Sequence, residues 1–311
     1  MLRWLALGSV RQRSVAARSG ALPNRVNLGY SRSVEAASAP VFLLDSDPLM
    51  AIAGERASEY HSARPFPHIA IDGLLPEDVI DGLIAEFPEP TDEWLFHTDW
   101  GNSRKFATND ESHMGPLTRQ VISQFNSGPM IRFLEELTGI QGLVPDPYLV
   151  GGGLHMLGRG GFLRVHADFN IHDHIKLDRR INLLLYLNPD WREEWGGSLE
   201  LWNEDVTSCE CKIVPLANRC VIFNTTDKSL HGNPEPVNCP DGMARRSLAF
   251  YYYTAGRPKE ERSAPHTTLY PGRGRRAKPP LRARGREVAL RTMPPILVDA
   301  LRGLRRRGRS T

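Results

Sequence analysis

The chain has 311 residues, of which 41% are hydrophobic and 24% charged, the ordinary mix of a globular protein that buries a sizeable core. No apolar run approaches the roughly 18 residues that a membrane-spanning helix needs, so we expect no transmembrane segment. The four cysteines form no Cys-x-x-Cys pair (Cys209, Cys211, Cys220 and Cys239). We therefore expect free thiols in a reducing cytoplasm rather than a zinc site.

The charge is distributed unevenly along the chain. Residues 1–33 hold six arginines and no acid, and residues 255–311 hold 16 lysines and arginines against four acids. Because the whole chain carries +3, the remaining residues 34–254 carry −15. Two basic ends thus flank an acidic middle part, whose own surface field does not attract polyanions such as nucleic acids.

The N-terminal 33 residues are rich in Arg, Ser and Ala, a composition typical of a mitochondrial transit peptide. The alternatives are a basic leader without a fold, or a chain that starts at Met50, and residues 1–49 would then be absent from the mature protein. We predict a disordered basic leader over residues 1–40 and a cytoplasmic location, with a mitochondrial one as the alternative.

The C-terminal residues 257–311 are predicted to form a basic, solvated tail. A short amphipathic helix is expected after Pro294 and Pro295. Binding of nucleic acid or anionic lipid is the weaker alternative for this tail, so we make no strong case for a nucleic-acid partner. The oligomeric state stays open.

Residues 41–256 are predicted to form a single domain whose first part, residues 64–145, supports the rest with helices. His68–Ile71 reads as a strand, and a helix begins at Pro76 with acidic residues in its first turn and ends before Pro88. The segments MGPLTRQVISQF and PMIRFLEELTGI predict two further helices, because their apolar residues recur at helical spacing.

From about Tyr148 the apolar pattern changes to a period of two, and residues 146–256 are predicted to be mostly β. Short strand-like runs follow one another, separated by Gly, Pro and Asn: YLVGGGLHML, GFLRVHAD, INLLLYLN, GSLELWN, CKIVPL, RCVIFN and RSLAFYYYT. Many short strands at regular spacing are typical of a β-sandwich or barrel. The expected fold class is therefore mostly β with flanking α.

The run RRINLLLYLNPDW is the clearest strand. Its alternation puts Ile181, Leu183, Leu185 and Leu187 on one face, which we expect to pack on the helices. The other face carries Asn182, Leu184 and Tyr186. Polar groups on the inner face of a buried strand indicate a lined pocket, and the alternative is a half-exposed strand with one wet face.

The segment FLRVHADFNIHDHIKLDRR concentrates groups that bind metals. His166 and Asp168 are two residues apart, so on an extended strand their side chains share a face and can hold one metal. A third ligand must come from elsewhere, and His231 follows the RCVIFN strand. Two histidines and a carboxylate form the facial triad of non-haem iron(II) sites. His172, Asp173 and His174 are expected to be loop residues, facing solvent or lining the rim of the site.

A further charged group lies on the strand ARRSLAFYYYT. Arg245 and Ser247 share one face of this strand, whereas Arg246 lies on the other. A guanidinium with a nearby hydroxyl is suited to a small dicarboxylate, because it offers a planar fork and one more donor. The alternative is that both arginines are surface residues.

Taken in order, GRGGFLRVHAD, LLLYLNPDW, EWGGSLELW, RCVIFN, SLHG and RRSLAFYYYT resemble the iron(II)/2-oxoglutarate-dependent dioxygenases, and among them the prolyl 4-hydroxylase-like branch. The resemblance covers about residues 151–254 and implies a double-stranded β-helix, or jelly roll, behind the N-terminal support helices. Many members of that branch have lysine where this chain has Arg245, which argues against a collagen-type substrate.

The resemblance also implies roles for single residues. His166, Asp168 and His231 match the iron ligands, and Arg245 with Ser247 matches the group that holds the distal carboxylate of 2-oxoglutarate. Tyr186 matches a tyrosine that shares this carboxylate, and Leu199 an apolar residue of the co-substrate pocket. We add Asn182 to the co-substrate residues because it shares the face of Tyr186.

The implied activity is hydroxylation of an unactivated C–H bond in a prolyl or other amino-acid, peptide or small-molecule substrate, with succinate and CO2 as co-products. The implied cofactors are Fe(II), the co-substrate 2-oxoglutarate, O2 and ascorbate as a reductant. The rival interpretations are an inactive jelly-roll binding module, a zinc hydrolase that uses the same triad, and a nucleic-acid demethylase of the same superfamily. The substrate and the position hydroxylated stay open.

Overall fold

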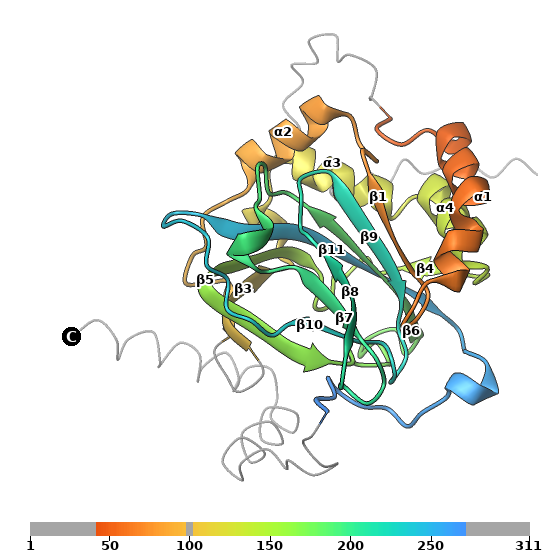
Figure 1. Ribbon diagram of the computed structural model, residues 1–311. Helices are drawn as coiled ribbons and strands as arrows, with labels where there is room; N and C mark the ends of the chain where they lie inside the picture. The colour runs from red at the N-terminus through yellow and green to blue at the C-terminus, as the bar shows by residue number, and fades with distance from the viewer. Residues whose placement is uncertain (1–41, 98–101, 272–311) are drawn as a thin grey trace, which may run out of the picture. The chain divides into compact units, whose positions relative to one another are not determined.

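The computed structural model describes residues 42–97 and 102–271, all of which belong to one compact unit that begins at Phe42 (Figure 1). The predicted basic leader over residues 1–40 and the predicted C-terminal helix lie outside the described residues. In the part of the chain that is described, no helix combines the length and the apolar character that crossing a membrane would require.

The first half of the described residues contains four α-helices. They are α1 (Ser46–Ser62), α2 (Glu77–Glu86), α3 (Pro116–Phe125) and α4 (Gly128–Thr138). The three predicted helices are confirmed as α2, α3 and α4. Pro116 opens α3 at a position where the missing N–H is not needed, and Gly139 ends α4 with a left-handed backbone at φ 69°.

Helix α1 was not predicted from the sequence. It buries only Leu49, Ala53 and Tyr60, so its apolar stripe is thin and its hydrophobic period is weak. Tertiary contact supplies what the pattern lacks, because the Tyr60 hydroxyl donates a 2.6 Å hydrogen bond to Asn224 Oδ1 in the sheet. The helix is therefore held by packing and by this bond rather than by its own periodicity.

The strands all pair antiparallel. Their bounds are β1 His68–Asp72, β2 Leu95–His97, β3 Asn102–Thr108, β4 Val144–Pro145, β5 Gly153–His166, β6 Asp178–Tyr186, β7 Leu199–Trp202, β8 Cys209–Ile213, β9 Arg219–Asn224, β10 Leu230–Asn233 and β11 Ala244–Thr254. The predicted runs YLVGGGLHML and GFLRVHAD are one long strand, β5, and the SLHG segment is itself a strand, β10.

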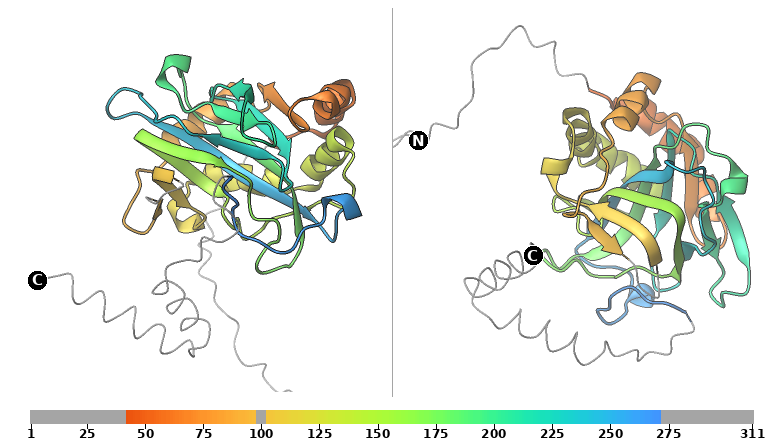
Figure 2. Two further views of the ribbon diagram at one scale, coloured as in Figure 1. Left: turned by 60° about the horizontal axis from the view of Figure 1, so that its bottom comes forward. Right: turned by 90° about the vertical axis from the view of Figure 1, so that its left-hand side faces the viewer.

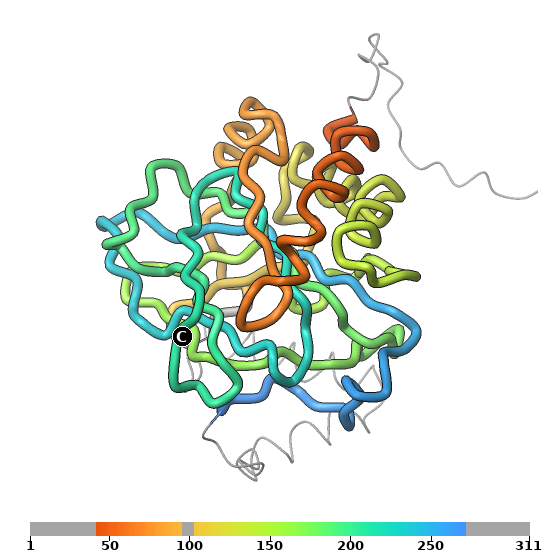
Figure 3. The backbone as a smooth tube through the Cα atoms, turned by 45° about the vertical axis from the view of Figure 1, so that its right-hand side comes forward, coloured from red at the N-terminus to blue at the C-terminus, as the bar shows by residue number. Residues whose placement is uncertain are grey.

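The sheet follows the order β1-β9-β6-β11-β5-β10-β7-β8, and β5 is where it folds over. The first half of β5, Gly153–Gly158, pairs with β11, whereas its second half pairs with β10. The result is a nearly closed antiparallel barrel, a jelly roll, as predicted. Figure 3 shows the four helices gathered on one side of it.

The two faces of the central strands follow the predicted alternation. Ile181, Leu183 and Leu185 of β6 join the helices in the largest hydrophobic cluster, together with Leu248 and Phe250 of β11. The opposite face of the same strands turns toward the barrel interior, where it lines a pocket. A polar interior face thus marks a pocket and not a wet outer surface.

Part of the predicted basic tail is packed against the barrel. Residues 257–271, which we call the return segment, run back from the end of β11 across the barrel opening (Figure 2). Leu269 exchanges two backbone hydrogen bonds of 2.8 and 2.9 Å with Ala167, the residue between the two predicted ligands of one strand. Because the return segment has no strand-like pattern in the sequence, its pairing with Ala167 could not be predicted.

Candidate metal centre and adjoining pocket

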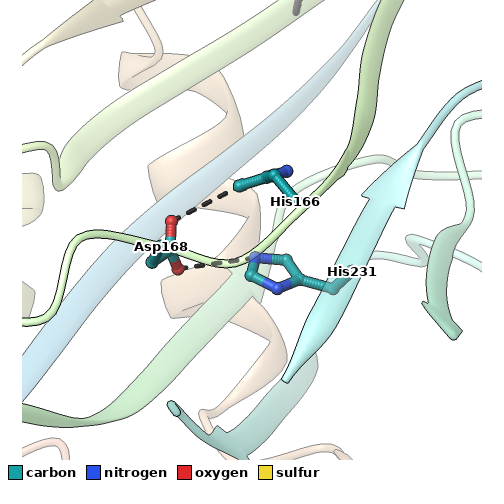
Figure 4. Close-up of side chains that lie close together, drawn as sticks. All are labelled: His166, Asp168 and His231. Atoms are coloured by element: carbon teal, nitrogen blue, oxygen red, sulfur yellow. Dashed lines mark ion pairs between the residues drawn. The ribbon is translucent and has the colours of Figure 1, made fainter. Parts of the chain in front are cut away.

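Three predicted ligands meet at the fold-over of the sheet. His166 ends β5, Asp168 follows two residues later, and His231 on β10 lies directly opposite His166 in the strand register. One ligand atom from each of the three side chains lies within 4.8 Å of the others. Figure 4 shows both imidazole rings turned toward the Asp168 carboxylate.

Both histidines present the same ring nitrogen to this centre. Nδ1 of His166 lies 2.8 Å from the carbonyl oxygen of Arg164, and Nδ1 of His231 lies 2.9 Å from that of Ser229. A carbonyl only accepts, so each Nδ1 carries the hydrogen and each Nε2 keeps a free lone pair. The Nε2 atoms lie 3.5 and 3.4 Å from the Asp168 oxygens. Burial, followed by the neighbouring His166, lowers the pKa of His231 to about 4, which maintains the neutral form that binds metals.

Asp168 is fixed by two neighbours on β6. Its Oδ2 lies 3.0 Å from Arg179 Nη2 and accepts a 2.7 Å hydrogen bond from Asn182 Nδ2. Asn182 Oδ1 in turn accepts bonds of 2.9 and 2.7 Å from Arg179. Burial by itself would raise the pKa of Asp168, but Arg179 and the two histidines lower it well below its usual value. The carboxylate is therefore ionised and oriented.

Arg179 is itself buried and sandwiched between aromatic rings. Its guanidinium carbon lies 3.5 Å from the ring centre of Tyr251 and 4.5 Å from that of Phe169. The side chain is 1% exposed. An arginine held on two aromatic faces has little freedom to leave its carboxylate.

Arg245 lies in the pocket on the face that the alternation predicted. Its Nε donates a 2.7 Å hydrogen bond to the carbonyl of Gly197, and its Nη2 donates a 2.9 Å bond to the hydroxyl of Tyr186. Arg246 faces the other way, 3.4 Å from Glu89 and with its guanidinium 5.1 Å from the Phe87 ring centre. The two arginines thus have separate surroundings.

The inner pocket extends from Arg245 to the three predicted ligands. Its polar lining includes Ser247, and its apolar lining is formed by Leu157, Leu163, Leu184, Leu199 and Phe223. Asn233 also lines it, and its buried Nδ2 has no hydrogen-bond partner among the described residues. An unsatisfied buried donor indicates a polar ligand in that place.

Most predicted site residues therefore meet. Arg245, Ser247, Asn182 and Leu199 line the pocket with the three ligands, and Tyr186 reaches it through Arg245. Asn182 also bonds Asp168 and Arg179, so it connects the metal-ligand candidates with the pocket. Sequence reasoning missed Arg179 and Asn233, whose contacts come from distant or separate strands and leave no local pattern.

His172 differs from the expectation of a solvent-facing or rim residue. It is fully buried, and its Nε2 lies 3.0 Å from Oδ1 of the equally buried Asp146. Asp173 and His174 are exposed, as predicted. A loop histidine has become a core group because a carboxylate 26 residues upstream is its partner.

Part of the chain is similar to proteins of known family. The 2OG-Fe(II) oxygenase superfamily profile matches residues 152–253. A curated relative from Mus musculus, prolyl 3-hydroxylase OGFOD1, is 24% identical over 200 residues, which cover 61% of this chain and 33% of that protein. The chain thus spans about a third of the length of the curated relative it matches.

Two of the solved structures that this chain matches are the following. A prolyl-4-hydroxylase from Pseudomonas putida is 17% identical, with a TM-score of 0.45 and coverage of 67% of this chain and 100% of that one. HygX from Streptomyces hygroscopicus, solved with nickel and 2-oxoglutarate bound, is 13% identical, with a TM-score of 0.45 and coverage of 69% and 96%.

Proposed function

We propose that the protein is an iron(II)- and 2-oxoglutarate-dependent dioxygenase that hydroxylates an unactivated C–H bond, because residues 152–253 match the 2OG-Fe(II) oxygenase superfamily. The observation that carries the proposal is that the three metal-ligand candidates and Arg245 converge on one pocket. Superfamily membership implies Fe(II), 2-oxoglutarate and O2. Ascorbate as a reductant is part of the proposal.

His166, Asp168 and His231 would hold the iron. Two nitrogens and one oxygen are a donor set that suits Fe(II) and leaves coordination positions open. The fit is supported by the Nδ1 hydrogen bonds, which direct both free Nε2 atoms toward Asp168. Fe(II) held there would supply the oxidative chemistry by which decarboxylation of 2-oxoglutarate with O2, yielding succinate and CO2, is coupled to hydroxylation of the second substrate.

Arg245 would anchor the far carboxylate of 2-oxoglutarate. Its guanidinium is already oriented by Gly197 and Tyr186, so little freedom is lost when the anion binds. Ser247 and Asn233 add further donors, and the leucine-lined walls, Leu199 among them, exclude water from the methylene groups between the two carboxylates. A zinc hydrolase would have no use for this arginine–tyrosine pair.

For the second substrate we propose only a chemical class, which is a prolyl or other amino-acid, peptide or small-molecule substrate. We propose residues 41–256 as the catalytic domain. The return segment is attached to this domain, because Leu269 pairs with Ala167. An inactive binding module would keep this fold but would not turn over 2-oxoglutarate.

The test is succinate formation by the purified protein with Fe(II), 2-oxoglutarate and O2. We expect His166→Ala, Asp168→Ala and His231→Ala each to lose at least about 99% of it, because each removes a metal ligand. His174→Ala is the matched control and should retain most of the activity, since this side chain is exposed. Full activity of His231→Ala would contradict the ligand assignment.

A further inference from the structure

A second cavity, of about 610 Å³, opens beside the metal-ligand candidates. His166 and Asp168 line it together with Phe169, Arg179 and Tyr251. Its outer walls come from β3, from the glycine turn Val150–Gly152 and from Thr267, Thr268 and Tyr270 of the return segment. The volume is ordinary for a small-molecule or side-chain site. We call it the outer cavity.

Lys105 is the charged residue of β3 that faces this cavity, and it lines the inner pocket as well. In the strand register Lys105 lies opposite Leu157 of β5, and Leu157 lies opposite Arg245 of β11. Residues directly opposite one another in antiparallel strands point to the same face. Lys105 and Arg245 therefore flank Leu157 in one row, at the junction of the two cavities.

The ammonium group of Lys105 has no hydrogen bond and no ion pair within the described part of the chain, whereas the neighbouring Arg179 and Asp168 are paired with one another. Burial lowers the pKa of Lys105, Asp168 opposes this, and Arg245 and Arg179 lower it further. Lys105 is half-buried in the lining of both cavities, so an anion bound there would meet a cation that no carboxylate of the protein has already paired.

The charges that line the two cavities do not balance. Lys105, Arg179 and Arg245 face a single carboxylate, Asp168. Arg179 is neutralised by Asp168 at 3.0 Å. In the proposed function one carboxylate of 2-oxoglutarate pairs with Arg245. Lys105 is then the side chain without a counter-charge.

We propose that Lys105 binds a carboxylate of the second substrate in the outer cavity, so that the enzyme acts on a carboxylate-bearing amino acid or peptide. This inference rests on the proposed function. The inner pocket already offers 2-oxoglutarate the donors of Arg245, Ser247 and Asn233, whereas Lys105 is the cation shared with the outer cavity. The carboxylate is either a free α-carboxylate or an acidic side chain next to the carbon that is hydroxylated.

The test uses protein loaded with Mn(II), which is paramagnetic and supports no turnover, and saturated with 2-oxoglutarate. N-acetylglycine carries a terminal carboxylate, N-acetyl-aspartic acid α-amide carries a side-chain carboxylate, and N-acetylglycinamide is the neutral control. Saturable broadening of the proton resonances is expected for at least one carboxylate and not for the amide. The compound whose proton resonances broaden more strongly shows whether the bound group is a terminal or a side-chain carboxylate.

Lys105→Met should weaken the carboxylate binding by at least about tenfold, and Lys105→Arg should retain much of it, because the positive charge remains. Equal broadening by carboxylates and amide, or an unchanged Lys105→Met, would overturn the inference. Thermal unfolding checks that Lys105→Met is folded; no loss of stability is expected, because the ammonium makes no bond within the described residues.

Failure of the inference is distinct from failure of the proposed function. Titration of 2-oxoglutarate should change by less than about threefold in Lys105→Met but by roughly 30-fold in Arg245→Gln. If Lys105→Met weakened 2-oxoglutarate as much as Arg245→Gln, Lys105 would belong to the co-substrate site and the inference alone would fall. If the wild-type protein with Mn(II) did not bind 2-oxoglutarate, the proposed function itself would fall.

Discussion

Asp168 is oriented by protein contacts before any metal arrives. Arg179 and Asn182 hold its Oδ2 oxygen and each other, and Tyr251 packs on the guanidinium. Groups that orient a ligand in this way commonly affect metal affinity by 10- to 100-fold, roughly, when they are removed. The candidate metal centre therefore includes three supporting residues besides the ligand candidates.

Arg179→Met should lower Mn(II) affinity by at least about tenfold. Without the guanidinium, Asp168 loses its orientation and the pKa of its carboxyl rises toward its usual value, so that protons compete with the metal. Arg180→Met is the matched control, because this neighbouring arginine lies 3.4 Å from Glu261 and makes no contact with Asp168. Equal Mn(II) affinities of the two variants in equilibrium titrations would show that Arg179 does not position the carboxylate.

Among single residues, those with a local sequence pattern could be predicted from the sequence. The two-residue spacing predicts that His166 and Asp168 lie together, and the strand alternation predicts that Arg245 faces the pocket. The structure shows both arrangements. The sequence could not reveal that His172 pairs with Asp146, or that Lys105 and Asn233 face the pocket. Those facts depend on which strands become neighbours, and side-chain spacing along one strand carries no information about that.

Among the elements, β10 has a close contact that fixes the centre. It brings His231 opposite His166, and this approach requires a residue without a side chain at Gly232. A Cβ atom there would lie 2.7 Å from the carbonyl oxygen of Leu163 and 2.9 Å from that of Arg164. Both oxygens belong to β5, so the clash would separate the two strands that carry the histidines.

Gly232→Ala should therefore weaken Mn(II) binding by at least about tenfold while the protein remains folded, because a backbone clash has to be relieved by strand displacement. Gly158→Ala on β5 is the control, since a Cβ atom there meets nothing within 4 Å. Circular dichroism and a metal titration on both variants decide the matter. Normal metal binding by Gly232→Ala would mean that the strand spacing does not set the geometry of the ligands.

The elements themselves were predicted unevenly. Strands with strong alternation, such as β6 and β11, were found with nearly correct bounds. Helix α1 and the return segment were missed, because both are held by contacts with residues far away in the sequence, among them Tyr60–Asn224 and Leu269–Ala167. Neither contact has a periodic trace in the sequence.

For the molecule as a whole, the buried neutral His231 links stability to pH. Its pKa is about 4 in the folded state and about 6.5 in an unfolded chain. Between these values the unfolded state binds the additional proton, so the stability contributed by this site is present above pH 6.5 and is lost as the pH falls toward 4.

We expect the metal-free protein to lose up to about 1.4 kcal/mol of stability per pH unit across this range from His231. Urea unfolding at several pH values measures the slope. His231→Gln, which cannot titrate, should show a shallower slope than the wild-type protein. Identical slopes would mean that His231 is not neutral and buried in the folded state.

The acidic middle part of the chain, residues 34–254, does not attract polyanions over a distance. Residues 34–254 carry −15 overall, yet the lining of the two cavities is positive. The total charge from the sequence predicted the first of these facts but not the second, because the few cations of the interior are brought together only by the fold. The positive lining of the two cavities therefore suits small anions bound between the strands.

We propose a metal-dependent 2-oxoglutarate site anchored by Arg245. Calorimetric titration measures the affinity of this site for 2-oxoglutarate. With Mn(II) present, Arg245→Gln should weaken binding roughly 30-fold or more, because a partly buried carboxylate loses its charged partner. Arg246→Gln should change it by less than about threefold, as expected for an arginine outside the pocket. Without metal, the wild-type affinity should drop markedly. Equal effects of the two substitutions, or metal-independent binding, would contradict the account.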